Sequence, residues 1–299
     1  MSNGISRIPE LPHEIRKAVN SSTLAVFIGA GVSRLEPINC HGWDELAKNL
    51  VKRCYKEGII NYKEKDTISQ IQDHKKTITI CFHLFENKDF FYEEMKKALK
   101  EGADIKNPNI YDDIYKLRGL FITTNADTHF DRLFNPPNIL YRASDFIADS
   151  LDSIKLYHIH GSVKDRTSLI FTVSEYMKRY TEPEFNRFLG KIFREYTVLF
   201  LGYGVAEFDI IEFILRNNPK NPALKPRHFL LSPFYSGEEN ILRYEQTYYN
   251  DLGINILGYE KDANGYNQLI EVIRRWNDEI NQVTGYLHGA SRLIDEAVE

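Results

Sequence analysis

Short apolar segments that end in glycine or a polar residue constrain this chain more than any other sequence feature. Residues 24–28 carry no polar side chain and run directly into Gly29, and comparable strand-length segments occur at 120–124, 155–159 and 198–201. A short apolar run bounded by glycine is typical of a strand buried on both faces of a parallel sheet. Because helical patterns separate these segments, the sequence predicts an α/β fold, a Rossmann-like parallel sheet with helices on both faces.

The remaining apolar periodicity divides the chain into further elements. Strands are expected at 139–141, 169–171, 228–231 and 254–257, and helices at 15–19, 174–179, 183–194, 208–215 and 238–249. Trp43, Leu46 and Leu50 recur at helical spacing, and helical patterns continue to Arg118. This stretch is too long for a single crossover, so we expect an inserted helical small module. The predicted units are therefore a Rossmann-like domain at 1–42 and 119–260, the module at 43–118, and C-terminal helices at 261–299.

The C-terminal pattern allows two interpretations. Leu269, Ile273, Trp276 and Ile280 follow one another at steps of four and three residues, which is typical of a helix–helix seam. The alternative is a terminal helix that packs on its own sheet. Gly285 weakens a long continuous helix and favours the second interpretation.

Composition and net charge argue against nucleic acids and membranes as binding partners. The 299 residues have a formal net charge of -4 and no cluster of Lys and Arg of the kind that a duplex binder needs, so no direct nucleic-acid contact is expected. The first residues lack the apolar stretch of a signal peptide, and no segment is long and apolar enough to span a membrane. We therefore expect a cytoplasmic protein that makes no membrane contact.

Cysteine usage points away from a zinc ribbon and from a disulfide framework. The three cysteines are Cys40, Cys54 and Cys81, and none of them forms a CxxC pair. Zinc ribbons require such pairs, and secreted disulfide scaffolds have regular, even-numbered cysteines. The sequence thus predicts no bound metal.

Gly29, Ala30 and Gly31 form a candidate phosphate loop directly after the first strand. Glycine lets the backbone approach a pyrophosphate, and a following helix offers free N–H groups. The third glycine of the usual fingerprint is missing, because Arg34 stands there, so a tight turn without a ligand is an equal alternative. No acidic residue follows a second strand about 20 residues on, which argues against an ordinary hydride-transferring dehydrogenase.

Polar or small residues follow four of the predicted strands. Each has a simpler explanation by itself: Asn125 as a cap of a helix that begins at Ala126, His160 as a core histidine, and Gly202 and Gly204 as turn residues. In an open parallel sheet, however, ligands bind beyond the carboxyl ends of the strands. The four ends together therefore predict one shared site.

These motifs resemble the sirtuin-like family, in particular its bacterial, defence-associated NAD-hydrolase branch. The matching segments are 29–33 (GAGVS), 123–125 (TTN) with Asp127 nearby, 158–161 (HIHG), and 202–204 (GYG) with Asp209 after it. The resemblance spans roughly residues 25–256. It implies a Rossmann-like NAD domain with a helical small domain, and NAD as the substrate.

The resemblance also implies a role for each motif residue. Asn125 and His160 are the expected catalytic pair, and Asp127 is expected near the nicotinamide. The remaining expectations are that Gly29, Ala30, Gly31 and Ser33 hold the pyrophosphate, and that Gly202 and Gly204 border the ribose and adenine.

Three departures from the family pattern affect the expected activity. Ala126 replaces the usual aromatic residue, and Asp131 offers a second acid four residues beyond Asp127. The four-cysteine zinc site of deacylating sirtuins cannot be built from three cysteines. We therefore expect an NAD hydrolase that cleaves the nicotinamide–ribose bond to give nicotinamide and ADP-ribose or a cyclic form, and that depletes NAD in bacterial antiphage defence.

Two other functions remain open on the sequence alone. One is an NAD-dependent protein deacylase or ADP-ribosyl transferase, and the other is a non-catalytic sensor module that binds NAD or ADP-ribose. The resemblance further implies a homo-oligomer, and an activating partner protein or a fused sensor region.

Overall fold

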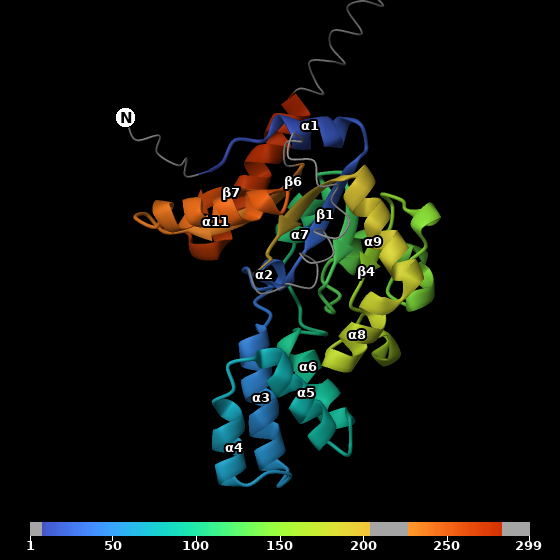
Figure 1. The fold of residues 1–299 in the computed structure, drawn as a ribbon, viewed down its shortest axis with the longest axis vertical. Helices are drawn as coiled ribbons and strands as arrows, with labels where there is room; N and C mark the ends of the chain where they lie inside the picture. The colour runs from blue at the N-terminus through green and yellow to red at the C-terminus, as the bar shows by residue number, and fades with distance from the viewer. Residues whose placement is uncertain (1–7, 204–226, 283–299) are drawn as a thin grey trace, which may run out of the picture.

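The computed structural model describes residues 8–203 and 227–282, and within these a parallel sheet forms the centre of the molecule. Seven strands pair in the order β3-β4-β2-β1-β5-β6-β7. The strands are β1 (Leu24–Ile28), β2 (Leu120–Thr123), β3 (Ile139–Leu140), β4 (Leu156–His158), β5 (Thr197–Leu201), β6 (His228–Phe234) and β7 (Ile254–Glu260). Helices cover both faces, so the predicted α/β, Rossmann-like fold is confirmed (Figure 1).

The central strand β1 shows why its sequence is apolar throughout. Leu24, Val26 and Ile28 belong to the core on one face of the sheet, whereas Ala25 and Phe27 belong to the core on the other face. All five side chains are fully buried. Successive side chains of a strand point to opposite faces, so a strand covered on both sides cannot alternate with polar residues.

Helices cover each face of the sheet with an apolar stripe. One face is covered by α1 (His13–Asn20), α7 (Ile110–Tyr115) and the helical residues 268–282, and the other by α9 (Pro183–Glu195) and α11 (Glu239–Asp251). In α9, Phe185, Phe188 and Ile192 recur at helical spacing and lie in the core. No helix within 8–203 and 227–282 is long and apolar enough to cross a membrane.

A small helical module lies beyond one end of the sheet, at the bottom of Figure 1. It comprises α3 (Trp43–Lys56), α4 (Tyr62–Ser69), α5 (His74–Leu84) and α6 (Asp89–Ala98), which share a third core. Asn61 and Asp73 are the N-cap residues of α4 and α5, since each side chain accepts a hydrogen bond from the backbone N–H three residues on. The buried residues of α7 pack in the core on one face of the sheet and not in the core of the module. We therefore propose that the module ends before α7.

One predicted strand is wrong. Residues 169–171 follow a single 3₁₀ turn and form no strand. Leu169 and Phe171 are buried against the helical module, so their apolar character reflects that contact and not pairing in the sheet. Ile170 is fixed by a backbone hydrogen bond from its N–H to the carbonyl oxygen of His160. The helix predicted at 208–215 lies outside the described residues.

The C-terminal pattern corresponds to packing on the chain's own sheet over the described residues. Leu269, Ile273, Trp276 and Ile280 are buried in the same core as the strands. The indole N–H of Trp276 donates to the carbonyl oxygen of Pro9 at 2.9 Å, which ties this helix to the segment before α1. Residues beyond 282 lie outside the described part of the chain.

The turn between β1 and α2 (Ala30–Ser33) packs backbone to backbone against the end of β5. The N–H of Gly29 donates to the carbonyl oxygen of Leu201 at 2.8 Å, and that of Gly31 to the carbonyl oxygen of Gly202 at 2.9 Å. Gly202 has a φ of 66°, and a Cβ atom there would lie 2.4 Å from the backbone nitrogen of Val32. The glycines thus allow a close approach that positions the start of α2 above the sheet.

Gly202→Ala should destabilise the fold more than the matched change Gly58→Ala. Both glycines have positive φ, but a Cβ at Gly58 meets no atom within 4 Å. Gly58→Ala should cost about 1 kcal/mol for the backbone conformation alone, and Gly202→Ala roughly 1–3 kcal/mol more for the steric clash. Urea denaturation of both variants measures the difference, and equal losses of unfolding free energy would contradict the close packing.

Candidate active site

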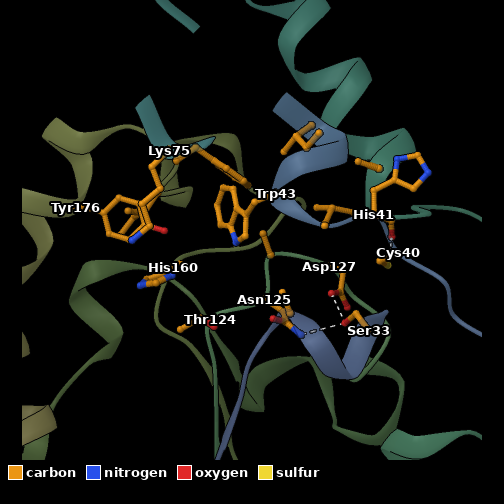
Figure 2. Close-up of a pocket in the computed structure, with 18 of the residues that line it drawn as sticks. Ser33, Cys40, His41, Trp43, Lys75, Thr124, Asn125, Asp127, His160 and Tyr176 are labelled. Atoms are coloured by element: carbon orange, nitrogen blue, oxygen red, sulfur yellow. Dashed lines mark hydrogen bonds between the residues drawn. The ribbon is translucent and has the colours of Figure 1, made fainter. Parts of the chain in front are cut away.

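A pocket lies between the carboxyl ends of the central strands and the helical module, and Figure 2 shows it in close-up. The sheet side contributes Ala30, Ser33, Asn125, Asp127 and His160. The facing side includes His41, Trp43, Leu46, Lys75 and Leu99. Strands β4, β2 and β1 are neighbours in the sheet, so the loops after them open into the same space.

Asn125 is held in place by its backbone and by its side-chain amide. Its N–H donates to the Thr123 hydroxyl at 2.9 Å, and that hydroxyl donates to the carbonyl oxygen of Ile28 on the neighbouring strand at 3.0 Å. The side-chain nitrogen donates to the carbonyl oxygen of Gly29 at 3.2 Å. The loop after β2 is therefore fastened to β1 at two points.

The second amide proton of Asn125 enters a buried network of hydroxyl groups. Nδ2 lies 3.0 Å from the Ser33 hydroxyl and 3.2 Å from the Tyr111 hydroxyl. The Ser33 hydroxyl donates to Oδ2 of Asp127 at 2.7 Å. Serine has one hydroxyl proton, so the Tyr111 hydroxyl, at 2.7 Å, must donate to Ser33. With these donors and acceptors assigned, the Asn125 side-chain atom next to the Ser33 and Tyr111 hydroxyls must be the nitrogen.

The carbonyl oxygen of the Asn125 side chain differs from the nitrogen in its surroundings. Oδ1 is buried and has no hydrogen-bond partner among residues 8–203 and 227–282. In Figure 2 the nitrogen points towards Ser33, while the oxygen lies on the side of His160. A buried acceptor without a donor costs about 1–3 kcal/mol, so this atom is prepared to accept a hydrogen bond from a bound ligand.

Asp127 and Tyr111 sit at the closed end of this network. Burial is the main cause that raises the pKa of the Asp127 carboxyl above its ordinary value, and it raises the pKa of Tyr111 well above the ordinary value as well. Tyr111 is 1% exposed and stacks on Phe130 at 4.8 Å between ring centroids. The network is thus anchored in the core of the sheet domain.

His160 lies at the other side of the same pocket, two residues beyond the end of β4. Its Nε2 is 2.9 Å from the hydroxyl of Tyr180, and its ring contacts Tyr176 edge-on at 4.9 Å between centroids. Both tyrosines belong to α8 (Val173–Thr181), which begins with a capping box between Thr172 and Glu175. The helix therefore holds the imidazole against the pocket wall.

His160 is a neutral imidazole at physiological pH. Burial, followed by the positive charges of Lys75 and Arg179, lowers the pKa of His160 to about 3. A neutral imidazole has a free lone pair, but a pKa of about 3 makes it a weak base before a ligand binds. A negatively charged ligand near Lys75 would raise this pKa and strengthen the base.

The helical module supplies an aromatic wall and one cation. Trp43 of α3 packs against Phe171 at 5.5 Å between centroids, and Lys75 of α5 places its ammonium 4.7 Å from the centroid of the Tyr176 ring. In Figure 2 Trp43 lies between Lys75 and His41, opposite Asn125. A flat aromatic or cationic ring fits such a wall by stacking.

Part of the sheet is similar to a known domain. Residues 119–256 match the SIR2-like domain. This match supports a sirtuin-like family for the chain, and domains of this type bind NAD. No curated protein matches the sequence.

The SIR2-like domain match covers Asn125, Asp127 and His160, whereas the glycine loop lies before it. Of the residues expected to bind NAD, Ala30, Ser33 and Asp127 line the pocket. Gly29, Gly31 and Gly202 are not among the lining residues and form the backbone contacts described above, and Gly204 lies outside the described residues. Residues 124–130 contain no helix, so Asn125 is not a helix cap.

Several residues that line the pocket or bond its side chains could not be predicted from the sequence. Tyr111 comes from α7, Lys75 from α5 and Tyr180 from α8, and none of them lies near a strand end. Tyr111 follows a capping asparagine, Asn109, which marks the helix start but says nothing of the hydroxyl's partner. Only the packing of the helices against the sheet brings these side chains to Asn125 and His160.

No metal site is apparent in the part of the chain that the structure describes. Residues 8–203 and 227–282 contain no group of three or more His, Cys, Asp or Glu side chains placed to hold an ion. Cys40 does line the pocket, but its thiol donates to the carbonyl oxygen of Leu99 at 3.2 Å.

Lys75→Met should raise the pKa of His160 from about 3 towards its ordinary value, because the substitution removes a positive charge that opposes protonation. The exposed Lys178→Met, on the neighbouring helix, is the matched control and should leave this pKa unchanged. Imidazole NMR shifts followed over an acidic pH series measure both. A His160 pKa that stays at its parent value in Lys75→Met would contradict the arrangement.

Proposed function

We propose that this protein is an NAD glycohydrolase that cleaves the bond between nicotinamide and ribose. The observation that carries the proposal is one pocket lined by both Asn125, whose Oδ1 has no hydrogen-bond partner in the described part of the chain, and the neutral imidazole of His160. Both residues lie in the segment that matches the SIR2-like domain. One group accepts a hydrogen bond and the other accepts a proton. Together they suit the activation of water or of a ribose hydroxyl.

Cleavage of the nicotinamide–ribose bond needs little acid catalysis. The nicotinamide nitrogen of NAD is already positively charged, so it leaves with the electron pair of the glycosidic bond as a neutral molecule. The transition state at the anomeric carbon then resembles an oxocarbenium ion, as in glycoside cleavage generally. Water forms the new bond to this carbon, and His160 takes the water proton. The products are nicotinamide, ADP-ribose and one proton.

The site residues divide into three tasks in this proposal. Asn125 orients the water or hydroxyl through Oδ1, while its nitrogen stays bound to Gly29, Ser33 and Tyr111. Asp127 lines the pocket and would accept hydrogen bonds from the N–H groups of the nicotinamide carboxamide. The aromatic wall around Trp43 excludes water from the dinucleotide, and substrate phosphates would raise the basicity of His160.

The pocket favours Asp127 over Asp131 as the acid that faces the substrate. Asp127 lines the pocket and accepts the Ser33 hydroxyl proton, whereas Asp131 is engaged by His158 and Lys164. Hydrolysis as the outcome is favoured over transfer to an acylated lysine because a four-cysteine zinc site cannot be formed from three cysteines. The expected oligomer, activating partner and role in antiphage defence stay predictions.

His160→Ala and Asn125→Ala should each slow NAD consumption by about 10²–10⁴-fold, the usual contribution of a positioned general base and its hydrogen-bond partners. Chromatography of products from NAD and concentrated protein measures the loss. Exposed Asn135→Ala, close in sequence to the site strands, is the control and should keep the parent rate.

The same assay separates the competing functions. A glycohydrolase releases ADP-ribose, or its cyclic form, from NAD alone, whereas a deacylase requires an acylated peptide and a sensor leaves NAD intact. NAD consumption at the parent rate by both site variants would contradict the assignment of Asn125 and His160.

A further inference from the structure

A second histidine contacts the backbone of Asn125 and has no role in the reaction proposed above. His158 is the last residue of β4, two positions before His160, and is 1% exposed. Its Nδ1 lies 2.8 Å from the backbone carbonyl oxygen of Asn125, and its Nε2 lies 2.9 Å from Oδ1 of Asp131. One ring thus connects the strand that carries His160 to the backbone of Asn125.

The partners of His158 determine its protonation state. A backbone carbonyl oxygen offers no proton, and an ionised carboxylate only accepts hydrogen bonds. Lys164 donates to the other carboxylate oxygen of Asp131 at 2.8 Å, which favours the ionised form of this acid. Both ring nitrogens of His158 must therefore donate, so the ring is a buried imidazolium paired with Asp131.

The charges around this pair are consistent with that state. Burial opposes the charge on His158, but the hydrogen bond and charge of Asp131 outweigh it, so the pKa of His158 lies above its ordinary value. The pKa of Asp131 lies below its ordinary value because His158 and Lys164 outweigh the burial of its carboxyl. Asp127 adds a further negative charge near the ring.

Another buried histidine of the same sheet provides a contrast. His228, at the start of β6, is 2% exposed, and its Nδ1 accepts a hydrogen bond from the backbone N–H of Val198 at 3.3 Å. Burial is the main cause that lowers the pKa of His228 to about 3. Two histidines that are both almost fully buried therefore differ in charge because one faces acceptors and the other faces a donor.

We infer that His158 is a positioning residue, whose imidazolium, held by Asp131, fixes the backbone of Asn125 so that Oδ1 of its side chain faces the reacting sugar. The inference rests on the proposed glycohydrolase function. A charge-assisted hydrogen bond is about twice as strong as a neutral one, and here it joins the segments that carry both proposed catalytic residues. A misplacement of about 1 Å can cost 10²-fold in rate, which gives this contact its importance.

The protonation state can be measured without any activity assay. In protein labelled with ¹⁵N-histidine, at a pH of about 8 and thus roughly 1.5 units above the ordinary histidine pKa, His158 should show two protonated ring nitrogens. His228 should show one protonated nitrogen under the same conditions. A singly protonated His158 ring overturns the inference by itself.

Two substitutions at His158 separate positioning from general loss of structure. His158→Leu removes the donor to Asn125 and should lower kcat for NAD roughly 10–100-fold, with a KM within about two-fold of the parent value. His158→Asn places an amide N–H close to the former Nδ1 position and should recover at least half of that loss on a logarithmic scale. His228→Asn is the matched control and should keep the parent kcat.

The possible results distinguish the inference from the function on which it rests. A fall in kcat at constant KM for His158→Leu, with recovery in His158→Asn, supports positioning. An equal loss of kcat in both variants, or no loss of kcat in either, overturns the inference. If the parent protein releases no nicotinamide from NAD, the proposed function fails, whereas the NMR measurement still decides whether His158 is a clamped imidazolium.

Discussion

The site depends on the hydrogen bonds that fix the orientation of the Asn125 side-chain amide. Its nitrogen donates to Gly29, Ser33 and Tyr111, and the Ser33 hydroxyl donates its hydrogen bond to Asp127. Because each donor and acceptor in this network is already assigned, the amide cannot turn without the loss of two or more hydrogen bonds. The carbonyl oxygen is consequently held buried without a hydrogen-bond partner among residues 8–203 and 227–282, at a cost that binding of a ligand donor would recover.

The sheet and the helical module make separate contributions to this pocket. The order β4-β2-β1 places the loops that carry His160, Asn125 and Ser33 side by side, and the backbone contact of Gly202 with the turn after β1 fixes the start of α2. The module adds Trp43 and Lys75 from the opposite side. A site closed by two units in this way can exclude water from a dinucleotide while its reacting groups stay on rigid strand ends.

Sequence reasoning found the elements that local patterns determine and missed those that depend on packing between elements. The buried strands, Asn125 and His160 were predictable because apolar runs that end in polar residues mark the ligand-binding edge of a parallel sheet. Tyr111 was not predictable, since nothing in its helix distinguishes a tyrosine that bonds Asn125 from one that only fills the core. The strand expected at 169–171 failed because a three-residue apolar run cannot be assigned to a sheet or to a covering loop without its partner. The glycines after β1 were recognised, but their close neighbour is the backbone of β5.

The most direct test of the central claim is a crystal structure of the His160→Ala variant with NAD bound. We expect the ribose attached to nicotinamide to lie in the pocket, with a hydroxyl or an ordered water within about 3.2 Å of Asn125 Oδ1. We also expect the Asn125 nitrogen to keep its bonds to Gly29 and Ser33. A dinucleotide bound outside the pocket, or an Asn125 amide turned so that Oδ1 faces away from the sugar, would contradict the central claim.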